Sequence, residues 1–130
     1  MKAGKELVLE YVEAFNGGEL DRLCGLFASD AQIWGVLGFG SIEQAQPVWK
    51  DLMECLQIHL KVEGIVDEKD VVAVRYVESG KAVKPFRGKP ATENTYELVA
   101  MEWFEVREGK ITRRWGARDS AAMAKQLGWE

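Results

Sequence analysis

An acid near the C-terminus stands where it could do chemistry. Asp119 ends the stretch ITRRWGARD, residues 111–119, whose alternate positions would share one face of a strand. If this carboxylate faces an apolar pocket, its pKa rises towards working pH and it can take a proton from a carbon beside a ketone. Ser120 and a helical run follow, so Asp119 is equally suited to capping a helix. Both roles are open at this point.

A second acid, Glu102, is placed on the same surface by a predicted β-hairpin. Segments 96–106 and 111–119 alternate as strands do, and Glu108 with Gly109 is typical of a two-residue turn. Pairing Arg107 with Lys110 then fixes every facing pair. One face is predicted to carry Leu98, Ala100, Glu102, Phe104 and Val106 opposite Asp119, Ala117, Trp115, Arg113 and Ile111.

The same register separates the two acids. Glu102 and Asp119 stand four residues apart along the hairpin, which is roughly 13 Å in a flat sheet. They are therefore not expected to share a proton. Glu102 has two open roles: a proton donor to a developing enolate oxygen, or the buried partner of Arg113, which lies diagonally across from it.

The opposite face of this hairpin is also apolar, which predicts that something covers it. Met101 and Trp103 lie there, with Arg114 across from Trp103 and close enough for a cation–π contact. We expect this outer face to form a homodimer interface.

The rest of the chain predicts the elements that position these residues. Apolar residues recur at helical spacing in 7–15, 19–27, 42–56 and 121–127, and with a period of two in 58–63 and 71–78. A short apolar piece, 32–36, reads as a first strand. Ser41 and Gln44 form a capping box, although Pro47 leaves open a helix that begins only there. We predict one α+β domain over residues 1–130, a cone-shaped α+β barrel in which a strongly curved, mostly antiparallel sheet wraps the N-terminal helices.

Several large side chains are predicted to line a pocket inside the curved sheet. Only one of Arg75 and Tyr76 can point inward, and Tyr76 is the pocket candidate. Aromatic residues at such spacings also fill cores, so both roles are open. The predicted lining residues are Trp34, Trp49, Tyr76, Leu98, Phe104, Arg113 and Trp115.

Basic residues crowd the segment before the hairpin. Lys81, Lys84, Arg87 and Lys89 lie between Ser79 and Thr92. They would attract an anionic substrate to the mouth of a pocket, or simply form a solvated turn.

Composition excludes several classes of function. The chain of 130 residues is 47% apolar and carries a net charge of −4, which argues against nucleic acids and anionic membranes as partners. Cys24 and Cys55 lack metal-ligand spacing, and His59, the only histidine, is predicted to point away from the pocket. We expect a cytoplasmic protein with no metal and no cofactor, whose ligand is a hydrophobic small molecule.

The C-terminal sequence EGKITRRWGARDSAAMAKQLG, residues 108–128, resembles the signature of SnoaL-like polyketide cyclases. VVAVRYVESG (71–80) and FRGKPAT (86–92) resemble the preceding strand and hairpin of that family. The resemblance implies a nuclear-transport-factor-2-like cone around a pocket, a homodimer, and an acid/base role for Asp119. The chain departs from the family at Gly80–Ala82, where related ester cyclases carry Gly-Thr-His, and at Glu102, where a histidine is frequent.

Three functions follow as expectations. The first is enolisation or intramolecular aldol cyclisation of a ketone, catalysed without a cofactor. The second is a non-catalytic ligand-binding or dimeric interaction module, favoured by the missing histidine and by an arginine partner for Glu102. The third is an epoxide hydrolase or a ketosteroid-isomerase-like enzyme, against which the separation of the two acids argues.

Overall fold

The computed structural model describes residues 2–35 and 38–129. The elements are α1 (Gly4–Asn16), α2 (Leu20–Cys24), β1 (Phe27–Gly35), β2 (Gly38–Gly40), α3 (Ile42–Cys55), β3 (His59–Glu68), β4 (Val71–Lys81), β5 (Thr95–Arg107), β6 (Lys110–Arg118) and α4 (Ser120–Leu127). The predicted α+β class is confirmed. The first strand begins five residues before the predicted one, whose last residue, Val36, lies outside the described residues.

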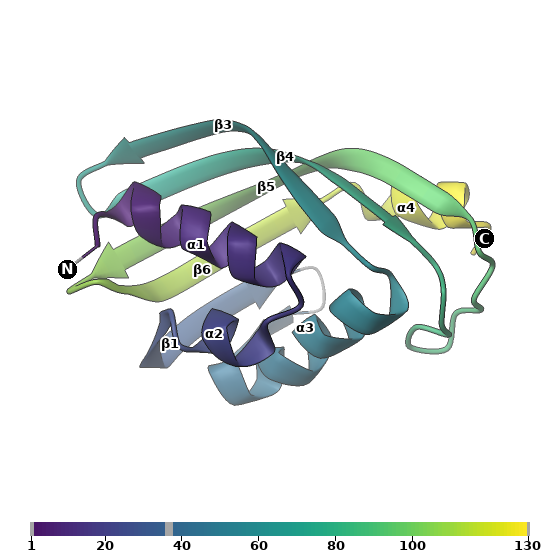
Figure 1. The fold of residues 1–130 in the computed structure, drawn as a ribbon, viewed down its shortest axis with the longest axis horizontal. Coiled ribbons are helices and arrows are strands. Elements are labelled where there is room, and N and C mark those ends of the chain that lie inside the picture. Colours follow the sequence, from purple (N-terminus) through teal and green to yellow (C-terminus); the bar gives the residue numbers. More distant parts are fainter. Residues whose placement is uncertain (1, 36–37, 130) are drawn as a thin grey trace.

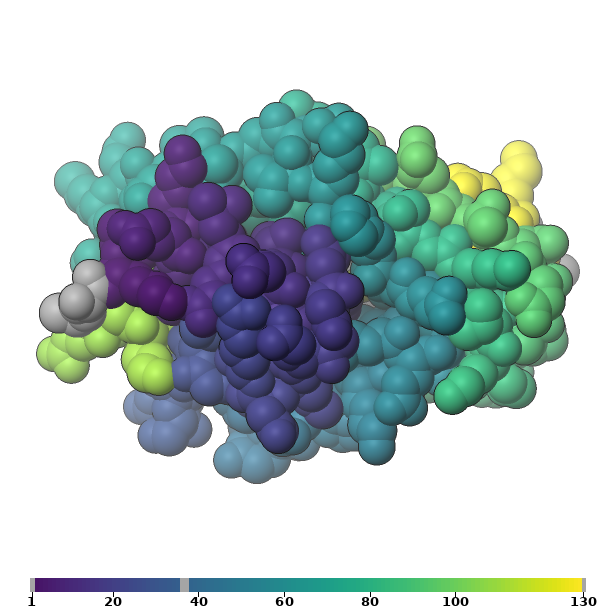
Figure 2. Space-filling view, in the orientation of Figure 1, coloured from purple at the N-terminus to yellow at the C-terminus, as the bar shows by residue number. Residues whose placement is uncertain are grey.

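Six strands form one curved sheet in the order β2-β1-β6-β5-β4-β3. All neighbours are antiparallel except β1 and β6, which run parallel. The sheet curves over α1, α2 and α3 and remains open at its edges, while α4 lies at the far end (Figure 1). The space-filling view shows α1 and α2 covering the sheet from the front (Figure 2). No helix in the described ranges is long and apolar enough to cross a membrane.

Local sequence explains where the main elements begin and turn. The Ser41 hydroxyl accepts from the backbone N–H of Gln44, whose side chain accepts from the Ser41 N–H, so the predicted capping box starts α3. The helix continues through Pro47 and does not begin there. At the β5–β6 turn, Glu108 and Gly109 both have positive φ, 51° and 74°, as a type I′ turn requires.

The helices bury one side against the concave face of the sheet. Tyr11 of α1 is 1% exposed and meets Phe104 of β5 edge to face, with ring centroids 5.0 Å apart. Trp49 of α3 packs on Phe27 at 5.2 Å. These aromatic contacts join α1, α3 and the sheet into one core.

A β-bulge on β6 overturns part of the predicted hairpin register. Arg107 pairs with Lys110 and Val106 with Ile111 as predicted, but Glu105 then pairs with Arg113. Thr112 is the extra residue, and its hydroxyl donates to the Glu105 carbonyl at 3.1 Å. Because one inserted residue exchanges the two faces of a strand, every predicted position from 113 onward is reversed.

The reversal corrects the predicted positions of five residues on β6. Arg114, Gly116 and Arg118 face the concave side, and Arg113 and Trp115 face outward. The predicted contact of Arg114 with Trp103 across the outer face is therefore wrong. So is the predicted pairing of Arg113 with Glu102, since Arg113 is exposed and its guanidinium lies 3.3 Å from Glu105.

The outer face of the sheet carries an aromatic strip. Trp34 stacks on Trp115 with centroids 4.7 Å apart and planes 2° apart, and Phe39 packs on Trp34 at 4.8 Å. Trp103 pairs with Trp115 across the strands and is 47% exposed, beside Met101 at 54%. Trp34 and Trp115 thus lie outside the pocket that they were predicted to line.

Candidate functional site

A cavity of about 520 Å³ lies between the concave face of the sheet, α3, α4 and the loop 82–94 that joins β4 to β5. Most of its wall is aliphatic or aromatic, which suits an apolar ligand of two or three rings. The apolar lining includes Phe15, Ile33, Val48, Trp49, Leu52, Ile58, Leu60, Phe86, Ala100, Met123 and Trp129.

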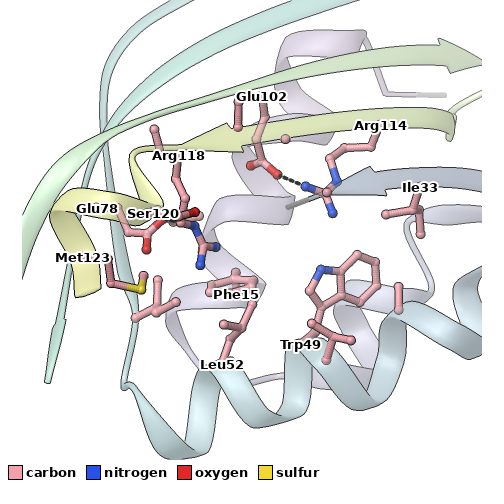
Figure 3. Close-up of a pocket in the computed structure, with 18 of the residues that line it drawn as sticks. Phe15, Ile33, Trp49, Leu52, Glu78, Glu102, Arg114, Arg118, Ser120 and Met123 are labelled. Carbon is pink, nitrogen blue, oxygen red and sulfur yellow. Dashed lines mark hydrogen bonds and ion pairs between the residues drawn. The ribbon is translucent and has the colours of Figure 1, made fainter. Parts of the chain in front are cut away.

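One polar cluster lies deep in the cavity and is built around Glu102. The Arg114 Nη1 donates to Glu102 Oε2 at 2.8 Å, and both side chains are only 10% exposed (Figure 3). The Tyr11 hydroxyl donates to the same oxygen at 3.0 Å. Strand pairing brings Tyr76 beside this pair, because Tyr76 stands opposite Ala100, two residues from Glu102.

Three buried polar atoms of this cluster have no hydrogen-bond partner among the described residues: Glu102 Oε1, Tyr76 Oη and Arg114 Nε. A buried polar atom left unpaired costs about 1–3 kcal/mol, so an unpaired set at a cavity wall is suited to a polar ligand. Glu102 Oε2 accepts two hydrogen bonds, whereas Oε1 accepts none from the described residues.

The two tyrosines of the cluster stay protonated. Burial, and then the negative charge of Glu102, hold the pKa of Tyr76 far above its ordinary value. The same two causes raise the pKa of Tyr11. Each hydroxyl is therefore a hydrogen-bond donor at any working pH, and that of Tyr76, which lies beside Glu102, has no acceptor within hydrogen-bond distance among the described residues.

A second polar cluster lies towards α4. Glu78 is 1% exposed, accepts from the Tyr96 hydroxyl at 2.5 Å, and lies 3.2 Å from Nε of Arg118. Burial raises the pKa of Glu78, an effect that Arg118 and Tyr96 oppose. The close-up places Arg118 and Glu78 beside Ser120 and Met123, away from the Glu102–Arg114 pair (Figure 3).

Gly116 provides the space for the Arg114 side chain. A Cβ on Gly116 would lie 2.1 Å from Arg114 Nη1 and 3.5 Å from Glu102 Oε2. A residue with a side chain at this position would displace the guanidinium from its carboxylate. The absent side chain at 116 is thus part of the site's geometry.

The structure divides the predicted lining residues into three groups. Trp49, Tyr76 and Glu102 lie at the cavity wall. Leu98 and Phe104 are buried in the core, 7% and 0% exposed, and are not among the lining residues. Trp34, Arg113 and Trp115 face the other side of the sheet. For Arg113 and Trp115 the reason is the bulge on β6.

Asp119 lies where its capping role predicts. Its Oδ1 accepts from the backbone N–H of Ala122 at 2.9 Å, at the start of α4. The residue is exposed and is not among those lining the cavity, although its neighbours Arg118 and Ser120 are. The acid/base role implied for Asp119 stays a prediction.

Sequence reasoning missed Tyr11, Glu78, Arg114 and Arg118 as site residues. Glu78 had a readable signal, since it shares a strand face with Tyr76 two residues earlier. Arg114 and Arg118 were missed because the bulge, which the sequence does not reveal, reverses the faces of β6. Tyr11 was missed because it belongs to the apolar face of α1, where core packing accounts for it. Among the described residues no group of three acidic, histidine or cysteine side chains could hold a metal ion.

The curved open sheet over three helices, with an apolar cavity inside, is the architecture of nuclear-transport-factor-2-like proteins. The model of the SnoaL-like domain matches residues 8–114. The chain therefore belongs to the SnoaL-like family.

Solved structures agree with this assignment. IdmH of Streptomyces antibioticus, a candidate polyketide cyclase, is 29% identical over 95% of this chain and 97% of its own, with a TM-score of 0.83. A candidate polyketide cyclase of Xanthomonas campestris is 26% identical over 95% of both chains, with a TM-score of 0.84. A Catenulispora acidiphila protein with a ketosteroid-isomerase-like fold, in complex with trimethylamine, is 18% identical over 99% of this chain and 96% of its own (TM-score 0.81), and is alike in fold. No curated protein matches the chain.

Gly116→Ala tests the packing of Arg114. We expect it to lower the free energy of unfolding by about 1–3 kcal/mol, because the displaced guanidinium leaves two buried charges poorly paired. The matched control is Gly35→Ala, whose Cβ would meet Arg114 Nη2 only at 3.8 Å and is expected to change stability by less than about 0.5 kcal/mol. Urea unfolding measures both, and equal losses would contradict the packing argument.

Asp119→Ala and Asp119→Asn test the cap. Alanine removes the acceptor for the Ala122 N–H and should cost about 1 kcal/mol, whereas asparagine caps as well as aspartate and should cost only a few tenths. The same urea titration checks this. Wild-type stability in Asp119→Ala would mean that the cap contributes nothing.

Proposed function

We propose that the protein is a cofactor-independent acid/base enzyme that enolises a ketone bound in the cavity and closes a ring by intramolecular aldol addition. The observation that carries the proposal is the pair of unpartnered buried atoms, Glu102 Oε1 and Tyr76 Oη, in one polar cluster of an otherwise apolar cavity. Such a pair supplies a proton acceptor and an oxyanion donor.

Arg114 and Tyr11 prepare Glu102 for this role. Both donate to Oε2, which fixes the orientation of the carboxylate. Oε1 then takes the proton from the carbon beside the ketone, and the C–H electron pair forms the enolate. The Tyr76 hydroxyl donates a hydrogen bond to the enolate oxygen, where negative charge develops.

In the ring-closing step Glu102 returns the proton that it took from the ketone. The enolate carbon attacks a second carbonyl of the same molecule, which forms one C–C bond and leaves an alkoxide. The proton held on Glu102 passes to that alkoxide and regenerates the carboxylate. Atoms and charge balance with no oxidant, reductant or metal in the sequence of steps.

Proton exchange tests this proposal without knowledge of the natural substrate. The wild-type protein should speed exchange of the α-hydrogens of 2-tetralone with D₂O, followed by NMR. Glu102→Gln should slow the catalysed rate by about 10² or more, because the base is lost. Tyr76→Phe should slow it about 10- to 100-fold, because an oxyanion donor is lost.

The matched control for Glu102→Gln is Glu105→Gln, on the same strand but paired with Arg113 on the outer face. It should exchange 2-tetralone as fast as the wild type. Asp119→Asn, which keeps the cap, should also retain the rate; loss of exchange there would move the base to Asp119. A wild-type protein that binds 2-tetralone but does not accelerate exchange would make the cavity a binding site without catalysis.

We further propose that two copies associate through the aromatic strip of the outer face, defined by Trp34, Phe39, Met101, Trp103 and Trp115. Large apolar side chains gathered on one exposed sheet surface are typical of an interface. A second copy bound to the outer face would stabilise β5 and β6, the strands that carry Glu102 and Arg114.

Sedimentation equilibrium tests this association. The wild type should sediment at twice the chain mass of 14.6 kDa, and Trp103→Glu should shift it to the monomer, because a buried charge without a partner opposes association. Leu9→Glu, a change at an exposed apolar residue of α1 on the helical side of the sheet, is the control and should remain dimeric. A monomeric wild type at all accessible concentrations would refute the interface.

A further inference from the structure

The cavity wall is positively charged although the chain is negative. Four cationic side chains line it, Arg87, Lys89, Arg114 and Arg118, against two carboxylates, Glu78 and Glu102. The whole chain carries a net charge of −4. A surplus of positive charge in a cavity with apolar walls attracts anions into it.

Arg118 has donors to spare for such an anion. Its Nε faces Glu78 at 3.2 Å, and no hydrogen bond joins its two terminal nitrogens to any described residue. The side chain is 19% exposed. In the close-up the guanidinium extends from β6 into the cavity above Phe15 (Figure 3). Two parallel N–H groups of a guanidinium match the two oxygens of a carboxylate.

The loop 82–94, which contacts the C-terminal end of α4, adds further positive charge to the cavity wall. Phe86 and Lys89 exchange two backbone hydrogen bonds of 2.9 Å across a turn at Arg87 and Gly88. The backbone N–H of Val83 donates to the Cys55 carbonyl of α3 at 2.9 Å. These hydrogen bonds fix the backbone of the loop where Arg87 and Lys89 line the cavity.

Contacts with the C-terminus secure the other side of this loop. The Thr92 hydroxyl donates to the Leu127 carbonyl at 2.6 Å, and the rings of Phe86 and Trp129 stack with centroids 6.0 Å apart. Arg87 is paired with Asp51 at 3.4 Å, whereas Lys89 has no ion pair among the described residues. Lys89 is thus the loop cation left for a ligand.

Arg114 and Arg118 are four residues apart on β6, and the Arg114 guanidinium lies over Gly116, two residues closer to Arg118. The two cationic groups are therefore separated by roughly 7 to 13 Å along the strand. A flat ligand of two or three fused rings spans this distance. Its two ends would meet two different polar environments.

We propose that the cavity selects amphipathic acids: fused-ring ketones that carry a free carboxylate at the end opposite the reacting carbonyl. Arg118 and Lys89 bind the carboxylate, and the Glu102–Tyr76 cluster receives the ketone. This names the substrate class of the proposed function and rests on it for the fate of the ketone end. A neutral ester of the same compound lacks the group that Arg118 recognises.

A matched pair of ligands tests the selection: anthraquinone-2-carboxylate and its methyl ester, compared by isothermal titration calorimetry. The wild type should bind the acid about tenfold more tightly than the ester, as expected for one charge-assisted contact. The preference is the ratio of the dissociation constants of ester and acid. Arg118→Met should bring this ratio close to one, and Lys89→Met should lower it from about tenfold to about threefold. Arg113→Met, on the outer face, is the control and should keep it.

Two further variants keep the test decisive if Arg118→Met does not fold, since it leaves Glu78 without its cation. Glu78→Gln/Arg118→Met removes both charges together and should keep only the part of the preference that Lys89 supplies. Arg118→Lys retains a charge without the fork and should show a reduced preference. Equal binding of acid and ester by the wild type overturns the proposal, as does an undiminished preference in the double variant and in Lys89→Met.

Failure of this proposal is distinguishable from failure of the enzyme proposal. Anthraquinone-2-carboxylate has no hydrogen beside its ketones, so its binding does not depend on enolisation. A protein that prefers the acid but does not exchange the α-hydrogens of 2-tetralone supports the selection and refutes the catalysis. Exchange of 2-tetralone with equal binding of acid and ester refutes the selection alone.

Discussion

The bulge at Thr112 is the constraint on which the site depends. In a regular hairpin the indole of Trp115 would point into the concave side, where Gly116 now leaves space for the Arg114 guanidinium. One inserted residue moves the indole to the outer face, where it stacks on Trp34, and brings two arginines inside. The same insertion therefore keeps the indole out of the cavity, places two positive charges at the cavity wall and forms the aromatic strip on the outer face.

Inside the cavity, each buried carboxylate has its own arginine. Burying a charge is costly unless it is paired and hydrogen-bonded, which explains why Glu102 has Arg114 and Tyr11, and Glu78 has Arg118 and Tyr96. The two carboxylates differ in how many of their oxygens have partners. Both protein donors to Glu102 use one oxygen, so the other has no hydrogen-bond partner among the described residues, while both oxygens of Glu78 are engaged. In our proposal this difference suits Glu102 to the proton transfer and Arg118, beside Glu78, to holding the substrate.

Much of the fold follows from local sequence signals. Ser41 and Gln44 start α3, Glu108 and Gly109 turn the last hairpin, and Asp119 begins α4, since each signal depends only on near neighbours. The site was less predictable because two adjacent arginines, 113 and 114, fit either face of a strand equally well. The bulge at Thr112 decides between them, and the alternation of apolar residues does not reveal it. Trp34 and Trp115 were misassigned for a related reason: an indole suits a pocket, a core or an outer stacking surface.

The central claim is that Glu102 and Tyr76 receive the enolate of a bound ketone. 2-Naphthol is a flat, stable analogue of the enol of 2-tetralone, and a crystal structure of its complex with the protein tests the claim most directly. The account predicts that its oxygen lies within hydrogen-bond distance of Tyr76 Oη, with the adjacent ring carbon facing Glu102 Oε1. A naphthol bound in the cavity with its oxygen turned away from both residues would contradict it.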